Sequence, residues 1–525
     1  MTATSACSLI KSGSKVHGAV SKWTLLKAYQ LFIFLGMCCF GLLEFANPLW
    51  DPHLQQFTLV LGVIGIWRYS WWFVHALRAE HYHSRVFPKH RKKADRLWES
   101  GWRPEGVHIL VTTFNENRKT TEHMLRSIIN EHYNSELPIT IWLGSSCDHD
   151  EEIIANYLQL HARDLAIDLN IVRQNQPGKR MAIGSVLRAM SRAEISDDEL
   201  VIFMDGDSIL SPGTFEKSFP VFAARPELQA LTTDEEVICI GPAWVEQWLK
   251  MRFAQRRIAM QSHAVSGKVL TLTGRMSIFK ANYITKNEFI RILEADHLDH
   301  WLWGRFRFLS GDDKSTWYYL LTQNAEMTYL PDVVVSTVEY VEGSGFKRMA
   351  QNFQRWSGNM LRNGSRAIGL GPRKVGFFIW WCLIDQRLAM WTTLISPTVA
   401  ASVSLLVDSR FIIAYFIWIL FSRLLLSLCL FRYSREVFFS WPFLLYINQM
   451  LNAVVKVYSL FRLSKQRWTN RGNQSSEDKH HVLKNYMASY TTAVWVASLI
   501  VFVTYYTGVL NRPEWLQVRY LVFGN

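Results

Sequence analysis

The sequence of 525 residues has few cysteines, and their spacing is not that of a metal or disulfide framework. The seven form no C-x-x-C pair and lie mostly in or near apolar segments. Zinc fingers and disulfide scaffolds rely on close, repeated spacings, so neither a zinc site nor a disulfide framework is expected, and a reducing cytosolic face fits this usage. The seven are Cys7, Cys38, Cys39, Cys147, Cys239, Cys382 and Cys429.

The sequence also lacks the motifs of nucleic-acid-binding domains. The net charge is +13, from 57 Lys and Arg against 44 Asp and Glu. Such an excess suits nucleic acid, anionic lipid or an acidic substrate. Because no zinc finger, RNA-binding sheet signature or basic helix is present, nucleic acid is the weakest of the three, and we expect no nucleic-acid partner.

Apolar residues, in contrast, are abundant. They make up 49% of the chain, which is too apolar for an ordinary soluble enzyme. Long apolar runs lie toward both ends, around a polar centre of domain size. We therefore expect three parts. Residues 1–77 form a tail and two transmembrane helices, 78–374 form a cytosolic domain, and 375–525 form transmembrane and interface helices with a cytosolic gating-type loop at 462–484.

The first two apolar runs set the expected orientation in the membrane. Residues 28–46 and 57–76 are each about long enough to cross a bilayer. The segment between them has no Lys or Arg, whereas 81–96 is rich in both, so the N-terminus and the central domain are expected to be cytoplasmic. The first run starts too late for a cleaved signal peptide. Arg68, within the second run, should face protein rather than lipid.

The apolar runs after the central domain are less regular. Residues 375–406 are interrupted by Asp385, Arg387 and Pro397, so the first part is expected along the interface and the second part across the membrane. Residues 411–431 are expected to cross.

A further run, 438–460, carries four polar residues and precedes a loop rich in Arg and Lys. If that loop is cytosolic, the run is interfacial or re-entrant. Residues 486–510 form the last crossing, which makes five crossings, with six as the alternative.

The centre of the chain alternates short apolar strands with amphipathic helices. This alternation is typical of a mostly parallel, doubly wound α/β sheet, and residues 211–345 continue as mixed α/β. Strands are expected at 107–112, 139–143, 167–172 and 201–204, and helices at 118–131, 151–163 and 180–191.

Two carboxylates follow the last of these strands. Asp205 and Asp207 lie one residue apart, where the strand ends in a Gly-containing turn. Ligands of open α/β sheets bind beyond the carboxyl ends of strands. Two Asp oxygens fill part of the octahedron of a hard divalent cation and leave room for diphosphate oxygens. The alternative is an Asp-Gly turn with Asp207 as a helix cap.

Two weaker motifs precede this pair. Thr113, Asn115 and Glu116 follow the first strand and reach the same edge of the sheet; the alternative is an Asn-capped helix start. The Gly-Lys-Arg turn at 178–180 opens a helix and, through Lys179, brings positive charge to a diphosphate; alternatively it is a solvated basic turn.

Two motifs follow it. Asp312 and Asp313 open an expected helix at 314–321, whose N-terminus keeps at least one of them ionised, as a general base requires. Double N-capping is the alternative. Arg355 and Trp356 pair a guanidinium suited to phosphate with an indole suited to stacking on sugar. Together the clusters favour a nucleotide-sugar transferase over a structural coincidence.

At this point the sequence resembles the processive family 2 glycosyltransferases, and among them the catalytic subunits of bacterial alginate (mannuronan) synthases. The resemblance implies an α/β GT-A (Rossmann-like) cytosolic domain embedded between α-helical transmembrane segments. It rests on five stretches that span most of the chain, at residues 65–70, 249–258, 272–279, 306–317 and 385–391.

The resemblance implies inverting, processive transfer of mannuronic acid from GDP-mannuronate to a β-1,4-linked chain, with Mg²⁺ or Mn²⁺ as cofactor. Asp205 and Asp207 match the metal motif, and Asp313 matches the catalytic base, with Asp312 beside it. Donor nucleotide and diphosphate contacts are expected at Thr113, Asn115, Glu116, Asp148, Lys179, Arg355, Trp468 and Arg471.

Some of these matches depart from the family pattern. In the Q-x-x-R-W motif, Asn352 stands in the Gln position and Gln351 lies one residue earlier. For the nucleotide-binding Asp, both Asp148 and Asp150 are candidates, and Asp148 is preferred. Residues 468–471 are similar to the W-G-T-R segment that closes over the nucleotide in related synthases.

The expected product carries a carboxylate on each sugar, so a basic path for the polymer is expected. Acceptor and polymer contacts are expected at Trp356, Gly274, Arg275, Trp303 and Arg305. Membrane lipids surround the helices, and the expected location is the bacterial inner membrane.

No cyclic-di-nucleotide receptor motif is evident in the chain. The resemblance therefore implies a separate cyclic-di-GMP receptor subunit, together with periplasmic alginate-export machinery. Two alternatives stay open, namely a hyaluronan-, chitin- or cellulose-type synthase using a UDP-sugar, and a membrane scaffold that only binds nucleotide.

Overall fold

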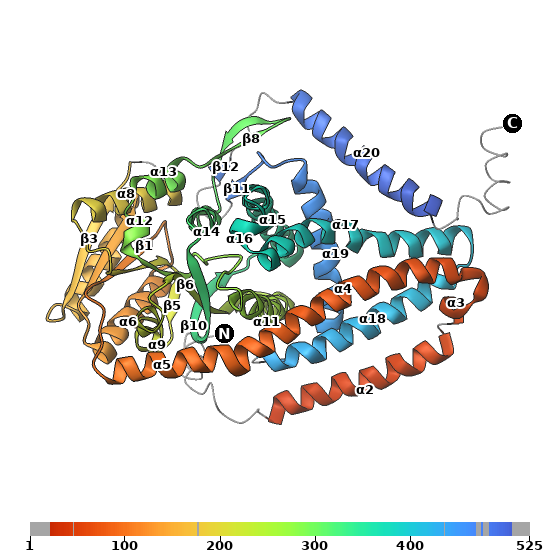
Figure 1. Ribbon diagram of the computed structural model, residues 1–525, viewed down its shortest axis with the longest axis horizontal. Helices are drawn as coiled ribbons and strands as arrows, with labels where there is room; N and C mark the ends of the chain where they lie inside the picture. Colours follow the sequence, from red (N-terminus) through yellow and green to blue (C-terminus); the bar gives the residue numbers. More distant parts are fainter. Residues whose placement is uncertain are drawn as a thin grey trace.

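The computed structural model describes residues 22–45, 47–175, 178–434, 436–468, 474–475 and 482–506. The catalytic-type α/β domain lies at one end of the molecule and the long apolar helices at the other (Figure 1). Arg471 lies outside the described residues, and Trp468 is described in its backbone alone.

The described residues form a central sheet with the strand order β3-β2-β1-β4-β7-β6-β10-β5. Its first four strands are parallel, as the alternating sequence predicted. Pairing of β1 with β4 sets Thr112 opposite Asp205, so both strands end at the same edge. These strands are β1 (Val107–Thr112), β2 (Ile139–Ser145), β3 (Ile167–Arg173) and β4 (Leu200–Asp205).

The second half of the sheet is mixed. β7 runs antiparallel to both β4 and β6, whereas β6 and β10 are parallel and β5 closes the edge antiparallel to β10. The strands are β5 (Ser208–Leu210), β6 (Leu228–Ile240), β7 (Met276–Lys280) and β10 (Glu326–Tyr340); β8 (His297–His300) pairs with β9 (Gly304–Arg307), and β11 (Arg467–Trp468) with β12 (Gln474–Ser475).

Helices cover both faces of the sheet, which explains why β4 is apolar at consecutive positions. Val201 and Phe203 pack on one face and Ile202 and Met204 on the other, because side chains alternate along a strand. The first face is covered by α8 (Lys179–Arg192), α13 (Asn287–Ala295) and α14 (Asp312–Thr322), and the second by α5 (Phe87–Glu99), α6 (Arg118–Ser135) and α7 (Asp148–His161).

Among the described residues, four helical segments are long and apolar enough to cross a membrane, and 29–45 is a shorter apolar one. They belong to α4 (Gln55–His81), α17 (Phe377–Leu406), α18 (Phe411–Leu430) and α20 (Val482–Tyr506), and the shorter one to α2 (Lys22–Phe45). α4 continues through a π-helical turn, Tyr82–Val86, directly into α5.

The expected division of 375–406 is not seen. α17 is one helix of 30 residues that keeps Pro397 inside it. A proline removes one hydrogen bond and strains the turn before it, but helix packing compensates, because α17 packs on α4, α18, α19 and α20. Asp385 of α17 pairs with Arg68 of α4 at 2.5 Å, which confirms that Arg68 faces protein.

The polar residues at 438–460 are explained by α19 (Trp441–Leu460). This helix packs on α15 (Gly345–Gly369) and on α11 (Ala243–Ala264). Asn448 accepts a hydrogen bond from the Trp248 indole at 2.8 Å. The helix therefore joins the catalytic-type domain to α17 and α18.

The remaining short helices complete the connections. They are α3 (Asn47–Trp50), α9 (Thr214–Ser218), α10 (Pro220–Ala224), α12 (Ala281–Ile284) and α16 (Gly371–Val375).

Candidate active site

The ends of β1 and β4 form the floor of the site. Gly206 follows Asp205, and its N–H donates to Thr112 O at 3.1 Å. A Cβ at Gly206 would lie 2.5 Å from Thr113 Cγ2, so the close approach of the two strand ends requires glycine here. The prediction that Thr113 and Asp205 lie at the same edge of the sheet is thus confirmed.

The loop after β1 is held by a buried carboxylate from the next unit of the sheet. Asp150, 1% exposed, accepts hydrogen bonds from Asn115 N at 2.7 Å and Glu116 N at 3.2 Å. Asn115 has a φ of 51°, a left-handed conformation that these bonds stabilise. Asp148 instead pairs with Arg173 at the surface, so Asp150 is the one of the two that touches the loop.

Lys179 joins two of the candidate carboxylates. It begins α8, and its Nζ lies 2.8 Å from Asp205 Oδ1 and 2.9 Å from Asp312 Oδ2. Its neighbour Arg180 is buried and donates to Ser310 O at 3.1 Å and to Ser315 Oγ at 2.9 Å. The Gly-Lys-Arg turn therefore contributes one cation to the site and one to the loop behind it.

The two carboxylates at the start of α14 differ in acidity. Burial acts to raise the pKa of Asp312, but Lys179 and Arg180 outweigh it and hold that pKa below its usual range. Burial raises the pKa of Asp313, and the negative charge of Asp312 raises it further. Asp312 is thus the ionised ion-pair partner, and Asp313 is the carboxylate with greater affinity for a proton.

The turn before α14 fixes these two side chains. Gly311 has a φ of 83°, which favours glycine, and a Cβ there would lie 2.7 Å from the Asn359 side chain. Asn359 Oδ1 accepts from Ser310 Oγ at 2.9 Å and from Arg362 Nη2 at 2.5 Å. α15 therefore supports the carboxylate pair from behind.

α15 also carries the Arg-Trp pair. Burial lowers the pKa of Arg355, and the ring of Trp356 stacks on Trp248 at 6.2 Å between centroids. Arg252 lies over Trp356, with its Cζ 4.4 Å from the ring centroid. Asn352, which stands in the family's Gln position, donates to Glu339 Oε1 at 3.3 Å.

A cavity of about 490 Å³ joins these groups to the membrane helices. At one end it is lined by Lys179, Asp205, Gly274, Arg275, Asp312, Asp313, Arg355 and Trp356. At the other it reaches Gln386 of α17, and Asn452 and Lys456 of α19. The lining therefore includes five of the expected donor and acceptor residues, namely Lys179 and Arg355 of the donor set and Gly274, Arg275 and Trp356 of the acceptor set. The expected donor residues Thr113, Asn115, Glu116 and Asp148 are not part of it.

Two expected acceptor residues do not line this cavity. Trp303 is buried and donates from its indole to Phe461 O at 3.0 Å. Arg305 is exposed on the β8–β9 hairpin and pairs with Asp299 at 2.8 Å. Trp303 instead anchors the segment that follows α19.

Four cavity cations were not assigned to the site from the sequence. Arg252 and Arg256 lie on α11, Lys314 on α14 and Lys456 on α19, and all four line the cavity. Both arginines fall within residues 249–258, one of the stretches that resemble the family. The sequence does not show, however, that their side chains face the cavity. Lys456 was noted only as a polar interruption of an apolar run.

The sequence of this chain matches a known protein family. The model of the family described as "Glycosyltransferase like family 2" matches residues 104–359. Glycosyltransferase alg8 of Pseudomonas syringae pv. tomato is 36% identical over 459 residues, which cover 87% of this chain and 93% of that protein. The chain belongs to the alg8 family of family 2 glycosyltransferases.

A second alg8 glycosyltransferase, from Azotobacter vinelandii, is 35% identical over 87% of this chain and 93% of its own length. Among solved structures, the mannosyltransferase PcManGT from Pyrobaculum calidifontis, in complex with GDP-Man and Mn²⁺, covers 73% of this chain and 99% of its own, at 17% identity and a TM-score of 0.46. Family membership and the observed sheet confirm the expected GT-A domain joined to membrane helices.

The candidate active site has groups that suit a divalent cation. Asp205 and Asp207 supply hard carboxylate oxygens, which Mg²⁺ and Mn²⁺ prefer. The Nζ of Lys179 lies between Asp205 and Asp312, which shows that this place attracts positive charge. The residues present therefore fit a hard cation.

Proposed function

We propose that this alg8-type glycosyltransferase polymerises mannuronic acid from GDP-mannuronate into β-1,4-linked polymannuronate, the alginate precursor, and passes it across the inner membrane. Transfer inverts the configuration at the anomeric carbon of the donor sugar and is processive. The observation that carries the proposal is a cavity whose lining includes Asp205, Asp312 and Asp313 together with Gln386 of α17 and Lys456 of α19. A scaffold that only binds nucleotide has no need of this arrangement.

Asp313 acts as the general base toward the acceptor hydroxyl. Burial and the charge of Asp312 raise its pKa, which brings a carboxylate nearer to the acidity that proton acceptance requires at neutral pH. Asp312, paired with Lys179, stays ionised and orients that lysine. The same helix start thus supplies two carboxylates with different tasks.

Donor binding uses the neighbouring carboxylates at the end of β4. Asp205 and Asp207 hold Mg²⁺ or Mn²⁺, which when bound offsets the charge of the diphosphate leaving group. Lys179 and Arg355 line the cavity and contribute positive charge toward the same diphosphate. The loop after β1, held by Asp150, borders the nucleotide.

The polymer leaves through the basic part of the cavity. Arg252, Arg256, Arg275 and Lys456 line it, and Trp356 offers an aromatic surface to a sugar ring. Each mannuronate adds one negative charge, so positive side chains compensate the polymer along the path.

Control and export are assigned to partners. A separate cyclic-di-GMP receptor subunit regulates the enzyme, and periplasmic alginate-export machinery accepts the product. The catalytic domain lies on the cytosolic side of a multi-pass inner-membrane protein.

The experiment is an assay of membrane vesicles containing this protein, with and without the receptor subunit and cyclic-di-GMP. The donors are GDP-mannuronate, UDP-glucose, UDP-glucuronate and UDP-N-acetylglucosamine. We expect nucleoside diphosphate release and alginate-lyase-sensitive polymer from GDP-mannuronate alone.

Asp313→Asn should lower polymer formation by roughly 10²–10⁴-fold while donor binding persists, since it removes the proton acceptor and little else. Asp168→Asn, at an exposed position of β3, is the matched control. Polymer from a UDP-sugar would change the donor, polymerisation by Asp313→Asn would remove Asp313 as base, and no polymer from any donor would favour the scaffold.

A further inference from the structure

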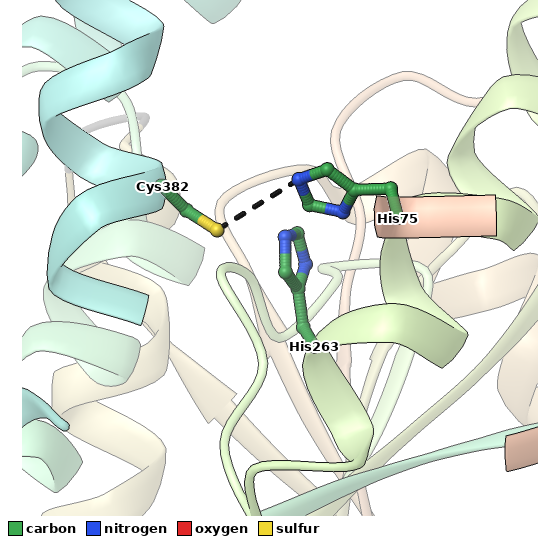
Figure 2. Close-up of side chains that lie close together, drawn as sticks. All are labelled: His75, His263 and Cys382. Carbon is green, nitrogen blue, oxygen red and sulfur yellow. Dashed lines mark hydrogen bonds between the residues drawn. The ribbon is translucent and has the colours of Figure 1, made fainter. Parts of the chain in front are cut away.

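Behind the cavity, three side chains from distant parts of the chain face one another. His75 comes from α4, His263 from the end of α11 and Cys382 from α17 (Figure 2). One ligand atom from each lies within 4.8 Å of the other two. His75 Nε2 and Cys382 Sγ are 3.9 Å apart, and the two imidazole rings are nearly perpendicular, at 87°.

These groups are enclosed and incompletely satisfied. His263 is 5% exposed and Cys382 is 3% exposed. Among the residues that the structure describes, the Nδ1 atoms of His75 and His263 are buried without a hydrogen-bond partner. The nitrogen of His75 that faces Cys382 is Nε2, so an ion between them would bind Nε2 and leave Nδ1 as the outer nitrogen of that ring.

We propose that His75, His263 and Cys382 form a binding site for a borderline-soft transition-metal ion of the Zn²⁺ type. Two imidazoles and a thiolate are ligands that zinc prefers. Tetrahedral coordination sets neighbouring N and S ligand atoms about 3.5 Å apart, so the observed 3.9 Å needs only a small closing movement.

The site is chemically distinct from the carboxylate site of the proposed reaction. Asp205 and Asp207 offer hard oxygens for Mg²⁺ or Mn²⁺, whereas the cluster offers nitrogen and sulfur. Three protein ligands leave a fourth position for water. His263 also lines the catalytic cavity, which gives an ion a route to the cluster.

One negative charge is available to an ion here. Cys382 loses its thiol proton to solvent when it coordinates, and the resulting thiolate offsets one of the two charges of the ion. The neighbouring Arg78 donates to neutral groups, Ser262 O at 3.2 Å and Ser266 Oγ at 2.6 Å, so it keeps its positive charge.

An ion at this place would join three helices. α11 belongs to the cytosolic domain and carries Arg252 and Arg256 of the cavity, whereas α4 and α17 are membrane helices. Coordination would therefore fix the catalytic domain against the membrane part.

The test is metal analysis of the full-length protein purified in detergent without chelating resins. We expect about one zinc per chain in the wild type, and a loss of most of it in Cys382→Ser and in His263→Ala. Cys429→Ser and Asp205→Asn are matched controls that should keep the zinc, since the first changes an exposed cysteine and the second the carboxylate site.

A second measurement does not depend on variants. Co²⁺ added to metal-free wild-type protein should produce a thiolate-to-cobalt charge-transfer band, which Zn²⁺ abolishes by displacement. Asp205→Asn should show the same band. Absence of the band, or a zinc content that does not change in folded Cys382→Ser, would overturn the proposal.

Discussion

At the scale of single residues, the site depends on two neighbouring carboxylates that differ in acidity. Asp312 is held ionised by Lys179 and Arg180, and its charge adds to burial in raising the pKa of Asp313. The two carboxylates differ in acidity because consecutive side chains of a helix point in different directions and face different neighbours. One side chain therefore tunes the other.

A pH profile of Asp312→Asn follows from this coupling. In its proposed role as base, Asp313 accepts a proton only when it is ionised, so activity should fall as the pH drops through its raised pKa. The substitution removes the Asp312 charge, which lowers the pKa of Asp313, and the acidic limb of kcat/KM should move to lower pH. Nucleotide release measured across pH in vesicles checks this; an acidic limb that stays in place or moves upward would contradict the coupling.

Gly274→Ala tests the packing around Lys179. A Cβ at Gly274 would lie 2.9 Å from Lys179 Nζ and 3.3 Å from Asp205 Oδ2. The lysine end can yield, so stability should change by less than about 1 kcal/mol. Activity should fall roughly tenfold, because small displacements of positioned groups are costly.

Turnover and thermal unfolding of Gly274→Ala are measured beside those of Gly369→Ala, where a Cβ meets nothing within 4 Å. Equal activities of the two variants would show that the position of Lys179 does not limit the reaction.

The sequence predicted the residues whose position is set locally. Asp205 follows a strand and Asp312 opens a helix, so period and turn residues were enough to locate both. The roles of Asp150 and Lys456 were not predicted, because they depend on which element packs against each residue. Asp148 and Asp150 both open the same helix, and only packing shows that Asp150 faces the loop after β1.

At the scale of elements, the segment after α19 is hydrogen-bonded to the loop before α14. Gln466, 3% exposed, accepts from Leu309 N at 2.9 Å and donates to Arg307 O at 2.9 Å. Trp303 adds its bond to Phe461 O. The start of the expected gating-type loop is therefore tied to the chain that leads to Asp312.

Gln466→Ala should loosen this connection. Two partly buried backbone groups lose their partner, which costs roughly 1 kcal/mol of unfolding free energy, and donor turnover should fall because Asp312 is less well held. Gln323→Ala, at an exposed position after α14, is the control and should behave as wild type. Unchanged unfolding of Gln466→Ala would show that the fastening adds no stability.

Element boundaries were predicted well where the pattern is local. The expected strand at 107–112 is β1 itself, and the expected helix at 180–191 differs from α8 by one residue at each end. The antiparallel insertion of β7 between β4 and β6 was not predicted, because neighbours in a sheet are chosen by long-range packing. The continuity of α17 was missed for the same reason, since its neighbours stabilise the helix around Pro397.

At the scale of the whole molecule, one cavity connects the reaction site with the membrane helices. Its lining combines carboxylates such as Asp205 with a larger number of cations, among them Arg275 and Lys456. A product that gains one negative charge per sugar would be attracted along its length.

Lys456→Glu should interfere with passage more than with chemistry. The reversed charge repels an anionic chain, so we expect roughly tenfold less polymer mass and shorter chains, with nucleotide release per donor much less affected. Gel-filtration sizing of the product and a nucleotide assay check this. Lys286→Glu, an exposed lysine outside the cavity, is the control; normal chain length in Lys456→Glu would argue against this exit.

The continuity of α4 and α5 has a mechanical consequence. Residues 52–99 form one helical run of 48 residues, about 70 Å long, that begins in the membrane part and ends beneath the sheet (Figure 1). A stiff rod of this length acts as a lever. A change of bilayer thickness that tilts its membrane end by a few degrees displaces its far end by several ångströms. Such a lever would carry a change in bilayer thickness from the membrane helices to the elements beneath the sheet.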